Sequence, residues 1–172
     1  MASAFSHIAV PAVLYASFKS DSVNLRLFIL ASVCSILPDA DVIAFKFGIP
    51  YGSQWGHRGF THSLAFALCL ASLLAYFYRQ LRSKPCAVFW LCFVSCASHA
   101  FLDAMTNGGL GVALYWPFSS ERIFLPFRPI QVSPIGVGSF FTEWGAAGDR
   151  FRTRLGVDSR FSGSHYWRVI AA

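Results

Sequence analysis

Four apolar segments constrain the fold of this chain more than any other feature of its sequence. They cover residues 4–18, 25–37, 64–78 and 86–105. Only the last reaches the roughly 20 residues that a helix needs to cross a bilayer, although shorter segments also span where the bilayer thins locally. Because 55% of the chain is hydrophobic and only 13% is charged, whereas soluble domains are about a quarter charged, we expect a membrane protein.

The predicted fold class is therefore all-α, a small polytopic membrane bundle of about four helices. A compact helical bundle that is only partly inserted is the alternative, because the first three segments are short.

Basic residues in the short loops predict the orientation of the bundle. Lys19 and Arg26 lie around the first loop, and the turn 79–84 contains Arg79, Arg82 and Lys84. Short loops rich in Lys and Arg stay in the cytoplasm. We therefore expect the N-terminus, the loop 38–61 and the end of the fourth segment to lie together on the non-cytoplasmic side.

Charge and cysteine content exclude two other classes of protein. The net charge is +6, but the basic residues are not gathered into the patch that phosphate recognition requires, so no nucleic-acid partner is expected. The five cysteines are odd in number and form no CxxC pair, so no disulfide framework follows.

His99 and Asp103 lie four residues apart in the last apolar segment, and a helix would place them on one face. Ionisable residues inside membrane segments are costly and usually functional. The alternative is a structural His–Asp hydrogen bond within one helix. Cys92 and Cys96 continue this face as soft metal ligands or, the interpretation we favour, as small packing residues.

Asp39 and Asp41 follow Pro38, which we expect to end the second helix. Two carboxylates this close repel each other unless a cation lies near them, and a divalent metal ion is the usual one. The alternative is that both aspartates only cap the helix or form a turn.

A loop before the third apolar segment contains two histidines, His57 and His62. Neutral imidazole is a good zinc ligand, and the guanidinium of Arg58 can bind an anionic substrate. We expect Thr61 to cap the following helix. The alternative is an aromatic-rich interfacial loop, and His7, alone in the first segment, is more often a polar contact than a ligand.

The predicted orientation, which rests on Lys and Arg alone, brings all these side chains to one membrane face. They exceed the three or four ligands of one catalytic zinc, so we expect two or more divalent ions. Zinc is favoured, while manganese or iron would accept the same donors, and paired metals suit phosphoester hydrolysis. The seven candidate ligands are His7, Asp39, Asp41, His57, His62, His99 and Asp103.

Four motifs in this order resemble the membrane-bound metal-dependent hydrolase family, described as LexA-regulated inner-membrane proteins. The motifs are LPDAD at 37–41, HRGFTHS at 57–63, HAFLDAMTNGG at 99–109 and YWPF at 115–118. The resemblance, which covers residues 4–145, implies a helical hydrolase of the bacterial inner membrane with a site distantly similar to that of zinc-dependent phospholipase C. It assigns metal binding to Asp39, Asp41, His57, His62, His99 and Asp103, and less directly to His7.

The expected reaction is hydrolysis of a phosphoester, including one in a membrane lipid, by a metal-activated water. Asp39, Asp41 and Arg58 are the expected catalytic residues, with one aspartate as general base and Arg58 on the anionic group. A metal transporter or a non-catalytic metal-binding protein is the alternative, and a defective remnant is a third. Residues expected to orient the ligands are Thr61, Ser63, Thr106 and Asn107.

The chain divides into two regions by texture. Residues 1–147 are expected to form the membrane-embedded hydrolase-like domain, ending in a Gly-, Pro- and aromatic-rich irregular stretch from 107 onward. Residues 148–172 are arginine-rich and carry neither an apolar period nor a capped helix, so we expect a poorly ordered tail. The resembled family continues there with an apolar helix, which suggests a reading-frame change that resequencing the coding region would test.

Overall fold

The computed structural model describes residues 4–18 and 20–131, and this part of the chain is all-helical. No strand occurs in it, only two isolated bridges that join Thr106 to Ile130 and Val112 to Ile123. The predicted fold class is confirmed. The helical elements are α1 (Ala4–Ser17), α2 (Leu25–Ile36), the 3-10 helices η1 (Leu37–Phe47) and η2 (Phe60–His62), α3 (Leu64–Tyr76) and α4 (Pro85–Ala104).

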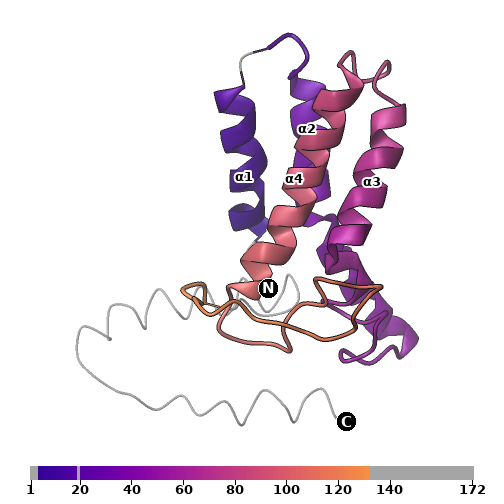
Figure 1. Cartoon of the computed structure of the whole chain (residues 1–172), viewed down its shortest axis with the longest axis vertical. Coiled ribbons are helices and arrows are strands. Elements are labelled where there is room, and N and C mark those ends of the chain that lie inside the picture. Colours follow the sequence, from indigo (N-terminus) through magenta and orange to yellow (C-terminus); the bar gives the residue numbers. More distant parts are fainter. Residues whose placement is uncertain (1–3, 19, 132–172) are drawn as a thin grey trace, which may run out of the picture. The chain divides into compact units, whose positions relative to one another are not determined.

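The four α-helices run alternately in opposite directions, and α4 packs against α1, α2 and α3 (Figure 1). Their bounds agree with the four apolar segments to within two residues at each end. Small buried side chains such as Ala31, Ala71 and Cys92 fill the contacts between helices. Small residues let helix backbones approach closely, as is typical of bundles in lipid.

The outward faces of the helices are also apolar. Val13, Leu73 and Trp90 are each more than half exposed, and exposed apolar surface on this scale marks contact with a membrane or another protein. Among the described residues, two helical stretches are long and apolar enough to span a bilayer. They are Leu25–Phe47, with 23 residues and a mean hydropathy of 1.9, and Pro85–Ala104, with 20 residues and a mean hydropathy of 1.7.

The second α-helix ends next to Pro38, as we expected, but the chain stays helical beyond it. α2 ends at Ile36, and the chain continues directly into η1 with Pro38 in the first turn. Proline is tolerated there because an N–H in the first turn of a helix has no partner to lose. Asp39 and Asp41 therefore project from helical backbone and not from a loop.

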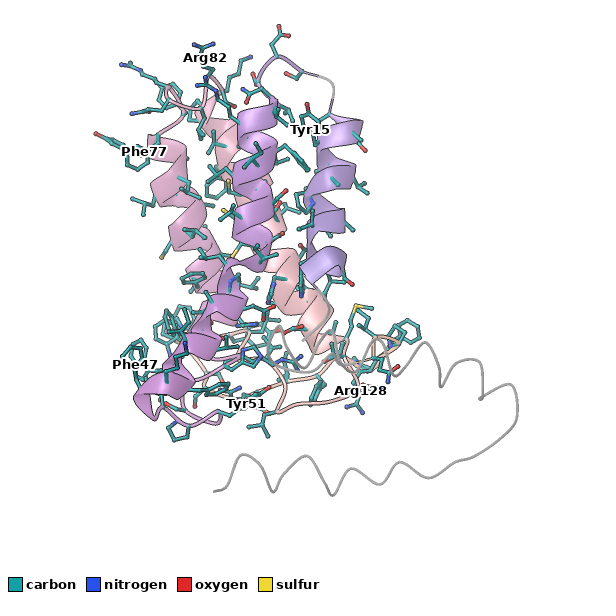
Figure 2. The ribbon with its side chains drawn as sticks, turned by 180° about the vertical axis from the view of Figure 1, so that it is seen from behind. Tyr15, Phe47, Tyr51, Phe77, Arg82 and Arg128 are labelled. Carbon is teal, nitrogen blue, oxygen red and sulfur yellow. The ribbon has the colours of Figure 1, made fainter. Side chains whose placement is uncertain are left out.

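The two basic turns meet at one end of the bundle. Asn24 caps α2 by accepting backbone N–H groups at 3.0 and 3.2 Å. Its side-chain amide donates to the carbonyl oxygens of Leu81 at 2.9 Å and Arg82 at 3.0 Å, in the turn before α4. Figure 2 shows Arg82 at this end and Tyr51 at the opposite one. The expectation that both turns share one end is thus confirmed.

The predicted division at residue 147 and the predicted tail 148–172 lie outside the described residues. Both stay predictions.

Candidate metal centre

α4 supplies two fully buried side chains to the candidate centre, His99 and Asp103. His99 Nδ1 lies 2.7 Å from the carbonyl oxygen of Ser35 on α2. Because a carbonyl only accepts hydrogen bonds, Nδ1 carries the proton and Nε2 presents a lone pair. The neighbouring helix thus selects the tautomer that a metal ligand needs.

His99 Nε2 belongs to a group of four potential donor atoms, with Asp39 Oδ1 from η1, His62 Nε2 from η2 and Asp103 Oδ2 from α4. Five of their mutual separations are 3.1, 3.3, 3.5, 3.7 and 3.9 Å, and all four atoms lie within 4.8 Å of one another. Ligands about 2.1 Å from a zinc ion at the corners of a tetrahedron are roughly 3.4 Å apart. The four donors therefore match the spacing of a divalent metal site.

Asp41 organises the loop that carries the other histidines. Its Oδ1 lies 2.6 Å from His57 Nδ1, and its Oδ2 lies 3.2 Å from His62 Nδ1. Oδ2 also accepts the hydroxyl of Thr61 at 2.6 Å and the backbone N–H of Arg58 at 3.2 Å. A carboxylate on Nδ1 fixes a ring's orientation and leaves Nε2 to bind metal. Thr61 thus contacts Asp41, and its role in orienting a metal ligand stays a prediction.

His7, on α1, lies against the four-donor group of Asp39, His62, His99 and Asp103. Its side chain is fully buried, its ring stacks on His99 with centroids 3.8 Å apart, and its Nε2 lies 3.8 Å from Asp103 Oδ1. Neither ring nitrogen has a hydrogen-bond partner among the described residues. An unpartnered polar atom in a dry interior is costly, so a metal ion at this position would satisfy it.

Arg58 is the bulkiest fully buried side chain in the described part of the chain. Its terminal nitrogens donate to Gly108 O at 3.0 Å and Thr106 Oγ1 at 3.1 Å, and its Nε lies 3.1 Å from Asp103 Oδ2. Its backbone is left-handed, with φ of 63°. Protein groups therefore hold the whole guanidinium, and contact between Arg58 and a substrate stays a prediction.

The loop histidines have opposite electrostatic environments. Burial raises the cost of charging His57 and lowers its pKa, although Asp41 opposes this effect. Burial also acts to lower the pKa of His62, but the three carboxylates around its ring outweigh burial and raise that pKa to about 10. Without a metal, the raised pKa favours a charged His62, which together with Arg58 compensates the aspartates.

The turn that enters α3 differs from our expectation in its capping residue. Ser63, and not Thr61, is the N-cap, because its Oγ accepts the backbone N–H of Phe66 at 3.0 Å. Immediately before it the chain is very tightly packed. A Cβ added to Gly59 would lie 2.1 Å from the carbonyl oxygen of Gln54, so only glycine fits this position without a backbone shift.

All seven predicted donors thus form one contiguous, largely buried group. Sequence reasoning missed three contributions to its surroundings. The carbonyl of Ser35 has no sequence signal, and the ring of Tyr51 meets His57 edge-on at 5.3 Å. Arg122 donates to the carbonyl oxygen of His57 at 2.8 Å, and only its basic charge within the aromatic-rich stretch could have drawn notice.

A buried set of His and Asp donors at one end of an apolar helical bundle defines a small helical membrane protein with a candidate metal centre. The chain belongs to the YdjM inner membrane protein family, which matches it over residues 1–169. It is 40% identical over 146 residues to the inner membrane protein YbcI of Escherichia coli (strain K12), and the match covers 84% of each chain. No solved structure matches it.

These relationships confirm the inner-membrane part of the resemblance drawn from the motifs. The family and the relative are described by their membrane location, and those descriptions name no reaction. Hydrolysis is therefore a proposal.

Proposed function

We propose that this protein is a metal-dependent hydrolase of phosphoesters in the inner membrane. The observation that carries the proposal is the group of four donors from Asp39, His62, His99 and Asp103, at separations that suit a divalent ion. The chemistry that such ions supply is activation of water and charge stabilisation at phosphorus. Zinc is the favoured metal, and manganese or iron are compatible with the same donors.

The remaining donors support the prediction of a second ion. His57 Nε2 is buried and has no hydrogen-bond partner among the described residues, and the same holds for both ring nitrogens of His7. In this proposal Asp41 holds the rings of His57 and His62 in place, and Arg58 holds Asp103. Asp39 is then the proposed general base, because it is the less buried of the two carboxylates in the four-donor group.

We further propose that all four α-helices cross the membrane, with the basic turns in the cytoplasm and the metal centre at the opposite face. The charge of the turn 79–84 supports this orientation. A centre at the end of a bundle can meet a lipid head group, and phosphoester-containing lipids are the substrates that this arrangement favours.

A non-catalytic metal-binding role is the second candidate, because four protein donors can close a tetrahedral site and closed sites are typically structural. Transport is less well supported. Transporter sites usually lie near the bilayer midplane on broken helices, whereas these donors lie at helix ends.

The test is metal analysis of detergent-purified protein together with a screen of phosphomonoester and phosphodiester substrates. We expect His99→Ala to lose bound metal and hydrolysis, because it removes one of four donors. Ser98→Ala is the matched control, since within the described residues that hydroxyl donates only to the carbonyl of Ser95, at 2.8 Å. Stoichiometric metal without hydrolysis of any ester would favour the non-catalytic role, and absence of metal would contradict both.

A further inference from the structure

A hollow of about 480 Å³ lies beside the metal centre, and none of the seven candidate ligands lines it. Its wall combines two indole rings, a guanidinium and small polar side chains. The residues that matter here are Ser53, Gln54, Trp55, Trp116, Ser120 and Arg122.

Arg122 brings a positive charge to this hollow. Its terminal nitrogens donate to three backbone carbonyl oxygens, those of His57 at 2.8 Å, Tyr51 at 3.0 Å and Ser53 at 2.9 Å. No carboxylate in residues 4–18 and 20–131 lies within ion-pair distance of it, whereas Arg58 pairs with Asp103 at 3.1 Å. Carbonyl groups carry no net charge. Of these two arginines, Arg122 is therefore the one that can attract an anionic ligand.

The guanidinium of Arg122 is also preorganised for an anionic ligand. Three of its five N–H donors are taken by carbonyls, which leaves the others available. The carbonyl bonds and the ring of Tyr51, 5.7 Å from the guanidinium carbon, fix the side chain. A preorganised guanidinium loses little entropy on binding a phosphate.

The rest of the wall suits an organic phosphate. Trp55 and Trp116 lie with ring centroids 6.1 Å apart, and Trp116 Nε1 donates to Gln54 Oε1 at 3.2 Å. Indole rings pack well against the carbon skeleton of a ligand and keep a polar edge. The hydroxyls of Ser53 and Ser120 add hydrogen-bonding groups.

Backbone contacts connect this hollow to the metal centre. Arg122 holds the carbonyl of His57, and Ala113, which lines the hollow, donates its N–H to the carbonyl of Arg58 at 3.0 Å. The backbone of residues 57–58 is therefore anchored to the wall of the hollow, while their side chains reach the metal centre.

We propose that this hollow binds the phosphate group of an organic ester, with Arg122 as its anion-binding residue. The identification of the ligand as the substrate of the metal centre rests on the proposed function. The phosphate chemistry is shared by lipid head groups and soluble esters, and the experiment distinguishes these sources.

The test places a carboxylate next to Arg122 without touching the carbonyl bonds that hold it. Ser120 is exposed, so Ser120→Asp is tolerated sterically, and Ser120→Asn has nearly the same size without the charge. Calorimetric titration of metal-free protein with inorganic phosphate in a neutral detergent is the first arm. Thermal shifts in nanodiscs of phosphatidylcholine, with and without phosphatidic acid, form the second.

We expect Ser120→Asp to weaken phosphate binding by about tenfold or more, the scale of a charged hydrogen bond, and Ser120→Asn to weaken it much less. A response to inorganic phosphate identifies a soluble source, and a response only to phosphatidic acid identifies a lipid. No binding in either arm, or equal effects of the two substitutions, overturns the proposal.

The two proposals fail in different ways. Charge-selective phosphate binding without any hydrolysis keeps the hollow as an anion site and removes the hydrolase. Hydrolysis with an unchanged KM in Ser120→Asp keeps the hydrolase and removes the hollow from substrate binding.

Discussion

His62 can be a buried cation or a metal ligand, and these two roles require different protonation states of its ring. Its Nε2 is 3.1 Å from His99 Nε2 and 3.5 Å from Asp103 Oδ2, so a proton on it satisfies a carboxylate in the metal-free site. The surrounding carboxylates raise its pKa from the ordinary 6.5 to about 10. A metal ion must replace that proton, because a ligand nitrogen offers its lone pair.

Metal binding should therefore release about one proton between pH 6.5 and 10. The raised pKa keeps His62 protonated in the metal-free protein over most of this window, so metal affinity should rise with pH and level off above it. The measurement is calorimetric titration of zinc in buffers of different ionisation enthalpy. Heats that do not depend on the buffer would contradict the assignment.

Asp41→Asn is the matched variant for this measurement. It keeps the shape of the side chain but removes one of the carboxylates that raise the pKa of His62. We expect fewer protons to be released and an affinity about 10–100-fold lower, the usual cost of losing a ligand-orienting partner.

At the scale of elements, the turn between η1 and α3, residues 48–63, determines whether the candidate donors lie close together. Asp41 lies on η1, yet its carboxylate binds His57, Thr61 and His62 from the far side of that turn. The turn is compact because the backbone of Gly59 lies against Gln54.

Gly59→Ala should open this turn and destabilise the protein by about 1–3 kcal/mol, the usual cost of overpacking. The new Cβ would meet a backbone carbonyl at 2.1 Å, whereas in Gly52→Ala the nearest atom is 3.9 Å away. Thermal unfolding in detergent and metal content are the measurements. Equal stability and metal content in both variants would show that the turn is less rigid than its packing indicates.

At the scale of the whole molecule, orientation decides which side of the membrane the candidate centre faces. The basic turns and the metal centre lie at opposite ends of the bundle, with Arg82 at one and Tyr51 at the other (Figure 2). If the turns are cytoplasmic, the centre faces away from the cytoplasm.

Labelling of intact cells with a membrane-impermeant maleimide tests this orientation. We expect Ser120→Cys to be labelled and Gln80→Cys to react only after the cells are opened, because these exposed positions lie near the two ends. The background should lack the exposed cysteines, Cys69 and Cys86, while the buried ones need no change. The reverse pattern would place the centre in the cytoplasm.

Much of the fold follows from sequence because apolar length and periodicity are local properties. The four apolar segments became α1, α2, α3 and α4 with nearly the same bounds. The end of α2 beside Pro38 also follows from the sequence, whereas the 3-10 helix η1 that continues the chain was not predicted, because it depends on the packing around it.

The sequence also identified the seven candidate donors and the end of the bundle at which they gather, because charge in the loops sets helix direction and residue type sets metal chemistry. Only the tertiary structure determined which of these donors surround one position and which contact other side chains. It placed four donors around one position, and it used Asp41 to hold two rings and buried Arg58 against Asp103. Distances of a few ångströms between segments far apart in the chain depend on side-chain packing, and no local pattern encodes them.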